Sequence, residues 1–374
     1  MKVPFVDLKK QLSFIRPEID EAINEVVDST SFINGKAISQ FEKSFSGLLG
    51  INYTVGVGNG TDALFIALKT LGIGVGDEVI TTANSFIATS EAITATGATV
   101  VFVDIFPDTF NIDTGLIEQK ISLKTRAIVP VHLYGQIADM DKIIQLSVKY
   151  NLFVIEDAAQ AHIAKYQFKS TIWKQAGTMS HIAAFSFFPG KNLGAFGDAG
   201  AVVTNDIVYA KRARMLANHG RVSKFDHEFE GLNSRMDTIQ AAVLSVKLKY
   251  LVDWTDKRRL LANYYIDRLS VIQQIQLPVF RINQNPVWHL FVILTDKRDD
   301  LKLFLKDKGI ETGIHYPIAL PNLKAYRYLN HSIDDFPVAS KYQENYLSLP
   351  IFPEMSYDQV DYVCEMIRKF YQKN

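Results

Sequence analysis

A single lysine stands in surroundings that could make its amine reactive. Lys191 lies in residues 186–200 (SFFPGKNLGAFGDAG), among glycines and aromatic residues, and not among the charges of a solvated helix face. Apolar neighbours lower the pKa of a lysine, and the free amine can attack a carbonyl carbon to form a Schiff base. The competing interpretation is an ordinary lysine in a surface loop.

Two other segments could hold a charged ligand beside that amine. Residues 56–62 (GVGNGTD) follow a predicted strand and open a predicted helix, so their backbone N–H groups could bind an anion. Asp157 ends the apolar run 153–156, and ligands of open α/β sheets bind at the carboxyl ends of strands. The structural alternatives are a tight turn capped by Thr61 or Asp62, and a helix N-cap at Asp157.

The combination of these three features matches the requirements of pyridoxal phosphate. This cofactor needs a phosphate site, an acid that keeps its pyridine nitrogen protonated, and an amine that forms a Schiff base. A nicotinamide-dependent dehydrogenase is disfavoured because Thr61 stands where the dinucleotide fingerprint has its third glycine. The GK[ST] signature of a P-loop is also missing from this turn.

The elements that must position these residues alternate between strands and helices from residue 51 to residue 205. That order predicts an α/β fold with a mostly parallel seven-stranded sheet covered by helices. The predicted strands are residues 54–57, 78–81, 99–103, 127–130, 153–156, 182–187 and 201–204. The predicted helices are residues 62–71, 85–96, 140–150 and 158–165.

A second, smaller unit is predicted after this sheet. Apolar positions recur at helical spacing after Arg235, which indicates one extended helix or two in series. Beyond residue 275 the pattern changes to isolated strands, helices and proline-marked loops, typical of an α+β domain. We therefore predict a large domain over residues 1–245 and a small domain over residues 246–374. Further elements are predicted as strands at 275–280, 288–294 and 313–315, and as helices at 18–27, 299–308 and 357–371.

Composition sets limits on the function. The 374 residues include 40 Lys+Arg and 40 Asp+Glu, a formal net charge of zero, which disfavours a general nucleic-acid binder. No apolar stretch approaches the ~18 residues of a membrane span, so we expect a cytoplasmic protein. The one cysteine, Cys364, excludes an internal disulfide, a thiolate zinc site and a multi-cysteine iron–sulfur cluster. We expect a buried structural thiol there and no metal site.

Seven ordered motifs connect the chain to a known family. They are residues 4–8 (PFVDL), 59–64 (NGTDAL), 76–80 (GDEVI), 131–136 (VHLYGQ), 156–162 (EDAAQAH), the loop of Lys191, and 233–237 (NSRMD). Over essentially its whole length the chain resembles the sugar aminotransferases of the DegT/DnrJ/EryC1/StrS family. These are pyridoxal-phosphate enzymes of aspartate-aminotransferase fold type I.

The resemblance implies a role for individual residues. Lys191 would form the Schiff base, Asp157 would pair with the pyridine nitrogen, and Gln160 would hydrogen-bond near the ring oxygen. The family pattern assigns the phosphate to Gly60, Thr61 and Ser186 and ring stacking to Phe86, which is otherwise expected as a core phenylalanine. Asn233 would reach the cofactor phosphate of the neighbouring subunit, so that a homodimer forms the site.

Departures from the family pattern bear on the reaction. Lys191 argues against the dehydratases that have histidine there, and the single cysteine argues against the iron–sulfur 3-dehydrase, which leaves transamination. Many members have histidine at the position of Phe188 and glycine at that of Ile163. An aromatic residue followed by PGKN resembles the branch that acts on 3-keto nucleotide sugars, as does HYPI at 315–318.

The expected reaction converts a nucleotide-linked 3-keto-6-deoxyhexose to the amino sugar, with L-glutamate as amino donor. The product would belong to the biosynthesis of a deoxyamino sugar for a surface glycan or glycosylated product. dTDP is the expected nucleotide, with UDP and GDP left open. Arg221, His315 and Tyr316 are candidates for the diphosphate. The alternatives are a 4-keto aminotransferase, a nucleotide-sugar dehydratase, and a non-catalytic regulator that binds the cofactor or a sugar nucleotide.

Overall fold

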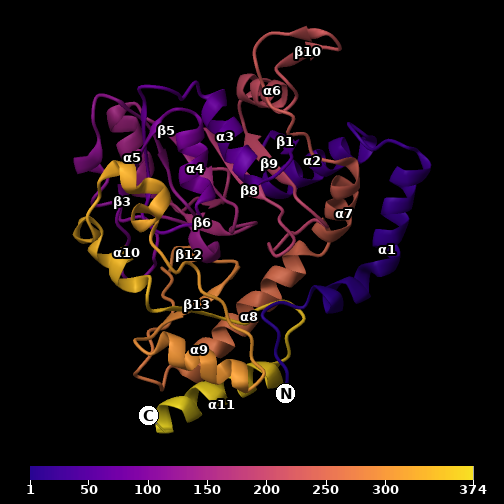
Figure 1. Cartoon of the computed structure of the whole chain (residues 1–374). Coiled ribbons are helices and arrows are strands. Elements are labelled where there is room, and N and C mark those ends of the chain that lie inside the picture. The colour runs from indigo at the N-terminus through magenta and orange to yellow at the C-terminus, as the bar shows by residue number, and fades with distance from the viewer. Residues whose placement is uncertain (374) are drawn as a thin grey trace.

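The computed structural model describes residues 1–373 and is built around a seven-stranded sheet (Figure 1). The strand order is β1-β9-β8-β5-β4-β2-β3, and only β9 runs antiparallel to its neighbours. The predicted α/β class with a mostly parallel sheet is confirmed. The strands are β1 (Tyr53–Val57), β2 (Glu78–Thr82), β3 (Thr99–Val103), β4 (Thr125–Val129), β5 (Phe153–Asp157), β8 (Ile182–Ser186) and β9 (Gly200–Thr204).

Helices cover both faces of this sheet, because alternate strand residues point to opposite sides. Val79 packs in one core and Ile80 in the other, and Ile155 and Val154 divide in the same way. The first face carries α3 (Gly60–Thr70), α4 (Ala88–Ala95) and α6 (Ile207–Leu216). The second face carries α2 (Lys36–Leu49), α5 (Met140–Tyr150) and α7 (Thr238–Leu248).

A second core lies below the sheet in Figure 1. The stretch after Arg235 forms two helices in series, and the second of them runs down into this core. Val3 also packs there and donates a backbone hydrogen bond to Gly309, so both chain ends lie at this end of the molecule. The elements of this core are α8 (Leu251–Leu269), β13 (Phe291–Leu294), α9 (Arg298–Asp307), β14 (Tyr346–Leu349) and α11 (Tyr357–Lys373).

The remaining elements are short, apart from α1 (Leu8–Asp28), which packs along α7. The hairpin of β10 and β11 projects from the top of the molecule in Figure 1. Within residues 1–373, no helix combines the length and apolar character needed to cross a membrane. The short elements are β6 (Lys165–Gln167), β7 (Trp173–Gln175), β10 (Arg221–Ser223), β11 (Asp226–His227), β12 (Gln284–Asn285), α10 (Pro337–Tyr342) and the 3-10 helices Glu118–Lys120, Leu133–Gly135, Leu320–Asn322, Lys324–Leu329 and Ile333–Asp335.

The predicted helix at 158–165 is wrong. Ile163 has a left-handed backbone with φ of 61°, which a right-handed helix does not contain, and Ala158 donates its N–H to Ala184 of the neighbouring strand. The segment therefore runs as successive turns into β6. The left-handed backbone also explains why glycine, which adopts this conformation at no steric cost, suits the position of Ile163.

Other boundaries also differ from those predicted. Helix α1 begins at Leu8, where the Asp7 side chain accepts from the N–H of Lys10, and Pro17 lies inside it. The helix predicted at 85–96 starts at Ala88. The strands predicted at 275–280 and 313–315 are reduced to isolated bridges, Gln276 with Leu294 and Gly313 with Ser348.

Candidate active site

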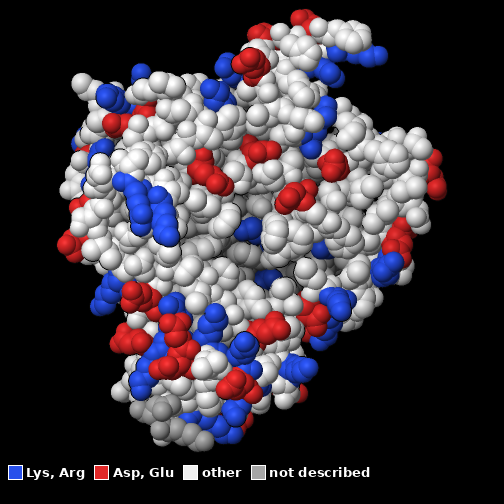
Figure 2. All heavy atoms as spheres, in the orientation of Figure 1, with Lys and Arg blue, Asp and Glu red and all other residues white. Residues whose placement is uncertain are grey.

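A cavity of about 860 Å³ opens at the carboxyl ends of β1, β5 and β8. Figure 2 shows the surface hollowed between the upper and lower parts of the molecule, with basic side chains visible inside and charges of both signs mixed around it. Nine of the predicted site residues line this one cavity: Gly60, Thr61, Phe86, Asp157, Gln160, Ser186, Lys191, His315 and Tyr316.

The loop that carries Lys191 is held from several sides. Lys191 donates its N–H to Phe188, and the side chain of Asn192 donates to the carbonyl of Val287 at 3.0 Å. Farther along the loop, Lys247 of α7 donates to the carbonyl of Gly194 at 2.7 Å. Burial lowers the pKa of the Lys191 amine to about 8, although the charge of Asp157 opposes this shift. Lys191 thus lies on a restrained loop and lines a cavity, and it is not a lysine of a surface loop.

The lowered pKa predicts how Lys191 captures an aldehyde as pH changes. With a pKa of about 8, about a tenth of the amine is unprotonated at pH 7 and most of it at pH 9. The rate at which the cofactor-free protein forms a yellow complex with pyridoxal phosphate should rise over this range and level off above it. Stopped-flow absorbance measures that rate, and a rate independent of pH would contradict the prediction.

Asp157 ends β5 with its carboxylate buried and oriented by two donors. Thr89 donates its hydroxyl at 2.7 Å to one oxygen, and the backbone N–H of Ala159 donates at 3.2 Å to the other. Burial raises the pKa of this carboxyl, while these two hydrogen bonds and the charge of Lys191 oppose the shift. Since no helix follows, Asp157 is not an N-cap. It is available to a cationic partner.

Gln160 has a fixed amide orientation. Its Oε1 accepts the backbone N–H of Tyr134 at 2.7 Å, so the other end of the amide, Nε2, is the donor and reaches the hydroxyl of Tyr316 at 3.0 Å. The hydroxyl of Tyr134 donates in turn to the carbonyl of His315. The side chain can therefore offer a hydrogen bond from Nε2 to a ligand in the cavity.

An anion cradle forms where α3 begins. Asn59, and neither Thr61 nor Asp62, is the cap, with its side chain accepting the N–H of Asp62 at 2.8 Å. The N–H groups of Gly60 and Thr61 have no acceptor within the helix and lie beside Ser186. A Cβ at position 60 would be 2.6 Å from the Cβ of Ser186, so only glycine leaves room. Together with Lys191 and Asp157, this cradle fits pyridoxal phosphate.

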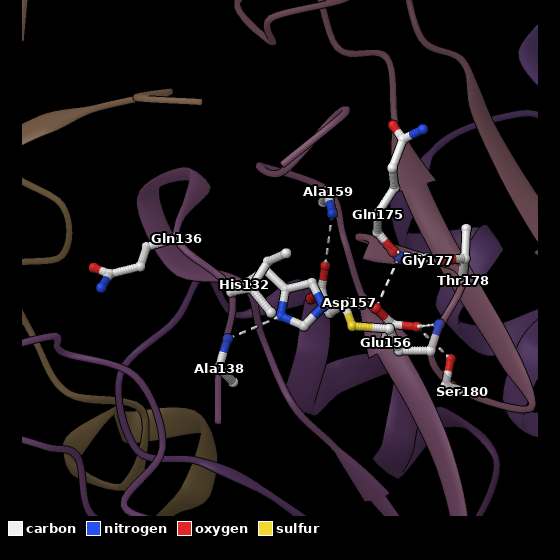
Figure 3. A network of polar contacts seen from close by, with 12 residues as sticks. His132, Gln136, Ala138, Glu156, Asp157, Ala159, Gln175, Gly177, Thr178 and Ser180 are labelled. Atoms are coloured by element: carbon white, nitrogen blue, oxygen red, sulfur yellow. Dashed lines mark hydrogen bonds and ion pairs between the residues drawn. The ribbon is translucent and has the colours of Figure 1, made fainter. Parts of the chain in front are cut away.

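A second network, centred on the fully buried Glu156 and His132, supports the strand end (Figure 3). Glu156 accepts hydrogen bonds from the N–H groups of Gly177 and Met179, the hydroxyl of Ser180 and the ring of His132, all at 2.8 Å. Nδ1 of His132 accepts the backbone N–H of Ala138, so the ring proton lies on Nε2. Because the backbone N–H of His132 donates to the Asp157 carbonyl, the pair fixes the segment that holds Gln160 and Asp157.

Removing the acceptor of this network should be costly. We expect Glu156→Ala to lower the free energy of unfolding by about 3–5 kcal/mol, because several buried donors lose their partner at once. Urea unfolding of the cofactor-free protein measures this. Glu78→Ala, which removes an exposed contact to Ser122, should cost under about 1 kcal/mol. Equal effects of the two substitutions would contradict the assignment.

Phe86, His315 and Tyr316 form one wall of the cavity. Phe86 is 53% exposed and its ring centroid lies 5.9 Å from that of Tyr316, so it is not a core residue. The His315 ring is hydrogen-bonded to the Ser348 hydroxyl at 2.8 Å, and burial with the charge of Lys191 lowers its pKa to about 4. His315 is thus a neutral side chain at pH 7.

Two predicted residues lie away from this cavity. Arg221 lines a separate cavity of about 410 Å³ that it shares with Arg214 and Asn218. Asn233 is exposed and accepts from Arg235. Lining residues that were not predicted as part of the site include Thr89, Arg258 and His289. The helical patterns around Thr89 and Arg258 gave no sign of a site, and His289 lies in a segment that was predicted only as a strand, residues 288–294.

Comparison with known proteins identifies relatives along the whole chain. The model of the DegT/DnrJ/EryC1/StrS aminotransferase family matches residues 13–368. The chain is 43% identical over 372 residues to dTDP-3-amino-3,4,6-trideoxy-alpha-D-glucose transaminase of Streptomyces venezuelae, covering 100% of this chain and 97% of that protein. It is also 43% identical over 374 residues to the pleiotropic regulatory protein of Geobacillus stearothermophilus, covering 100% and 99%.

Solved structures share the fold. The S. venezuelae DesV structure in complex with a ketimine intermediate has a TM-score of 0.96 at 43% identity and covers 99% of this chain and 98% of that one. The ntda structure from Bacillus subtilis with bound cofactor PMP has a TM-score of 0.89 at 34% identity and covers 98% and 85%. The resemblance of the motifs is thereby confirmed: the chain belongs to the DegT/DnrJ/EryC1/StrS aminotransferase family and is a pyridoxal-phosphate-dependent aminotransferase.

Proposed function

We propose that this aminotransferase moves an amino group from L-glutamate to a nucleotide-linked 3-keto-6-deoxyhexose in the cytoplasm. The product is a deoxyamino sugar destined for a surface glycan or glycosylated product. The observation that carries the proposal is the meeting of Lys191, Asp157 and the cradle at Gly60 in one cavity. The cofactor is pyridoxal 5'-phosphate, with pyridoxamine 5'-phosphate as its aminated form.

Different residues of the cavity would bind different parts of the cofactor. Lys191 would hold it covalently, Asp157 would pair with its ring nitrogen, and Nε2 of Gln160 would donate to its ring oxygen. The face of the ring would lie on Phe86, which is exposed in the cavity. The phosphate of the cofactor would accept hydrogen bonds from the free N–H groups of Gly60 and Thr61 and from the hydroxyl of Ser186.

When bound, the cofactor supplies an electron sink for the carbanion that forms at the amine-bearing carbon of the substrate. With an amino donor bound, the amine of Lys191 would be free to act as a base. With a pKa lowered to about 8, that amine can accept a proton near neutral pH and return it at the neighbouring carbon. Asp157, buried at the end of its strand, would stabilise the positive charge on the ring nitrogen.

The regiochemistry rests on motifs and on relatives. The aromatic Phe188 before PGK, together with the HYPI motif, favours a 3-keto sugar, and the similar S. venezuelae protein is named for a 3-amino sugar linked to dTDP. A 4-keto substrate is the alternative within the same fold. A purely regulatory role is disfavoured, although one relative carries a regulatory name, because a binding protein does not need the amine of Lys191.

A visible spectrum tests the proposal. Pyridoxal phosphate should give the purified protein a yellow absorbance that L-glutamate converts to the colourless aminated form. Addition of a dTDP-linked 3-keto sugar should restore the yellow form and give an amino sugar whose nitrogen is placed by NMR. A yellow form that L-glutamate leaves unchanged would overturn the donor assignment, and amination only of a 4-keto sugar would overturn the regiochemistry.

The same proposal includes a homodimer. Large apolar side chains stay exposed near the cavity and around the start of α7, at Phe188 (57%), Phe196 (43%), Phe32 (45%) and Ile33 (50%). Ile33 and Asp237 form a bridge, and Gln240 of α7 accepts the N–H of Phe196, so these side chains belong to one region. A second copy would cover this surface and bring its Asn233 to the cofactor phosphate.

Mixed subunits test this arrangement. If Asn233 acts across the interface, the hybrid of a Lys191→Ala subunit and an Asn233→Ala subunit holds one site with both defects and one with neither. We expect that hybrid to exceed the more active of the two homodimers in turnover per site, with up to half of its sites intact. Activity equal to the mean of the homodimers would argue for a site within one chain.

A further inference from the structure

Arg258 is a buried cation without an acidic partner. It lies on α8 with a 5% exposed side chain, and one terminal nitrogen donates to the carbonyls of Ile351 at 2.8 Å, Trp288 at 3.1 Å and His289 at 3.5 Å. Its Nε is buried without a hydrogen-bond partner. No ion pair to Arg258 is formed by any residue from 1 to 373, and the field of Glu354 reaches it only from beyond contact distance.

The guanidinium of Arg258 therefore has hydrogen-bond donors that no group in the described part of the chain uses. Burial lowers the pKa of Arg258 to about 10, which still leaves the guanidinium charged at neutral pH. A buried charge is normally balanced by an opposite charge, and a guanidinium offers five N–H donors in a planar fork that matches a carboxylate. Three carbonyls occupy Nη1 of Arg258 and its Nε is shielded from the cavity, so Nη2 is the nitrogen of the guanidinium that remains for an anion.

The position of Arg258 indicates which anion this is. Among the described residues that line the cavity, the lysines and arginines are Lys191 and Arg258, and Lys191 is committed to the cofactor. Arg258 donates to the carbonyl of His289, and both residues line the cavity together with Lys191, so the guanidinium and the reacting amine share one cavity. His289 and His315 are neutral there and do not replace the guanidinium.

Three groups of the proposed substrates are anionic: the α-carboxylate of L-glutamate, its side-chain carboxylate, and the diphosphate of the nucleotide sugar. They differ in their distance from the reacting carbon, since two methylene groups separate the side-chain carboxylate from that carbon. The α-carboxylate of an amino donor is attached to the carbon that reacts, so it must lie close to Lys191. The diphosphate of a nucleotide sugar is separated from C-3 by ring atoms and lies farther out. We propose that Arg258 binds the α-carboxylate of the amino donor through its free N–H groups. This inference rests on the proposed aminotransferase function and adds its donor-binding residue.

Binding of an unreactive diacid tests the assignment without turnover. Glutarate, which has the carboxylates of the donor but no amine, is titrated by calorimetry into the protein loaded with pyridoxamine phosphate. Arg258→Gln should weaken glutarate binding by about 10-fold or more, since a charge-assisted hydrogen bond to a buried site is lost. The titration is repeated with cofactor-free protein in phosphate buffer. If the protein does not bind the cofactor, the proposed function is refuted, but the effect of Arg258→Gln on glutarate binding can still be measured.

The matched control is Arg259→Gln. Arg259 is the next residue of α8, and its side chain is occupied by the carbonyl of Pro286 and by Asp256 and is absent from the cavity lining. This variant should bind glutarate as the unchanged protein does. Equal weakening by both variants would reduce Arg258 to a structural role and overturn the proposal.

Two further measurements distinguish binding of the donor carboxylate by Arg258 from binding of the diphosphate and from a folding defect. Binding of dTDP alone should be the same in Arg258→Gln and the unchanged protein, whereas loss of dTDP binding with glutarate binding intact would assign Arg258 to the diphosphate. If Arg258→Gln does not fold, Arg258→Lys takes its place. The lysine keeps the charge but not the fork, so glutarate binding should still weaken several-fold, and unchanged affinity would contradict the assignment.

Discussion

Lys191→Ala is expected to leave a folded protein that binds pyridoxal phosphate without a covalent bond and cannot complete amino transfer. The rate of L-glutamate conversion should fall by at least about 10⁴-fold, because the variant loses both the nucleophile and the group that moves the proton. The yellow form of the bound cofactor should not appear, and dialysis should remove the cofactor. Single-turnover absorbance with L-glutamate measures the rate.

Lys247→Gln provides a control for the loss of a buried lysine. Burial lowers the pKa of Lys247 to about 8, as it does for Lys191, but its amine donates to Gly194 and does not line the cavity. This variant should still form the yellow complex, with a loop that is held less firmly. Normal turnover in Lys191→Ala would remove the lysine from the reaction and refute its assignment.

Much of the site could be predicted because its residues lie in short, local patterns. Asp157 ends an apolar strand, Lys191 follows another, and Gly60 opens a helix, and parallel strands bring their carboxyl ends to one edge of a sheet. Strand periodicity and turn residues are local signals, so all seven sheet strands were found to within about two residues. The contacts between these segments follow from the sheet order.

The features that were missed depend on contacts between distant segments. Thr89 reads as an ordinary helix residue, and only packing places its hydroxyl 2.7 Å from Asp157, 68 positions later. Arg258 sits in a charged helical stretch that resembles a solvent-exposed face, yet the helix buries it under the loops of Trp288 and Ile351. The helix predicted at residues 158–165 also failed, because Ile163 has a left-handed backbone that its local sequence does not indicate. No local propensity carries this information.

Asp157→Asn should separate catalysis from stability. The amide keeps the shape of the side chain but cannot carry the charge that pairs with a protonated ring nitrogen, so conversion of L-glutamate should slow by roughly 10³-fold, about 4 kcal/mol of transition-state stabilisation. Asp198→Asn changes an exposed carboxylate of the same cavity and should cause a much smaller loss. Comparable losses in the two variants would refute the pairing role.

The same substitution should not weaken the cofactor-free protein. Burial raises the pKa of Asp157 above its unfolded value, so the folded state holds the proton more tightly and its ionised form costs free energy at pH 7. That cost disappears as pH falls toward the unfolded pKa of about 4, and the asparagine never incurs it. Asp157→Asn should therefore unfold at equal or higher urea concentration than the unchanged protein at pH 7, with the difference shrinking toward pH 4. A large destabilisation at pH 7 would contradict this prediction. It would mean that the ionised carboxylate stabilises the fold, whereas we expect its ionisation to lower the free energy of unfolding.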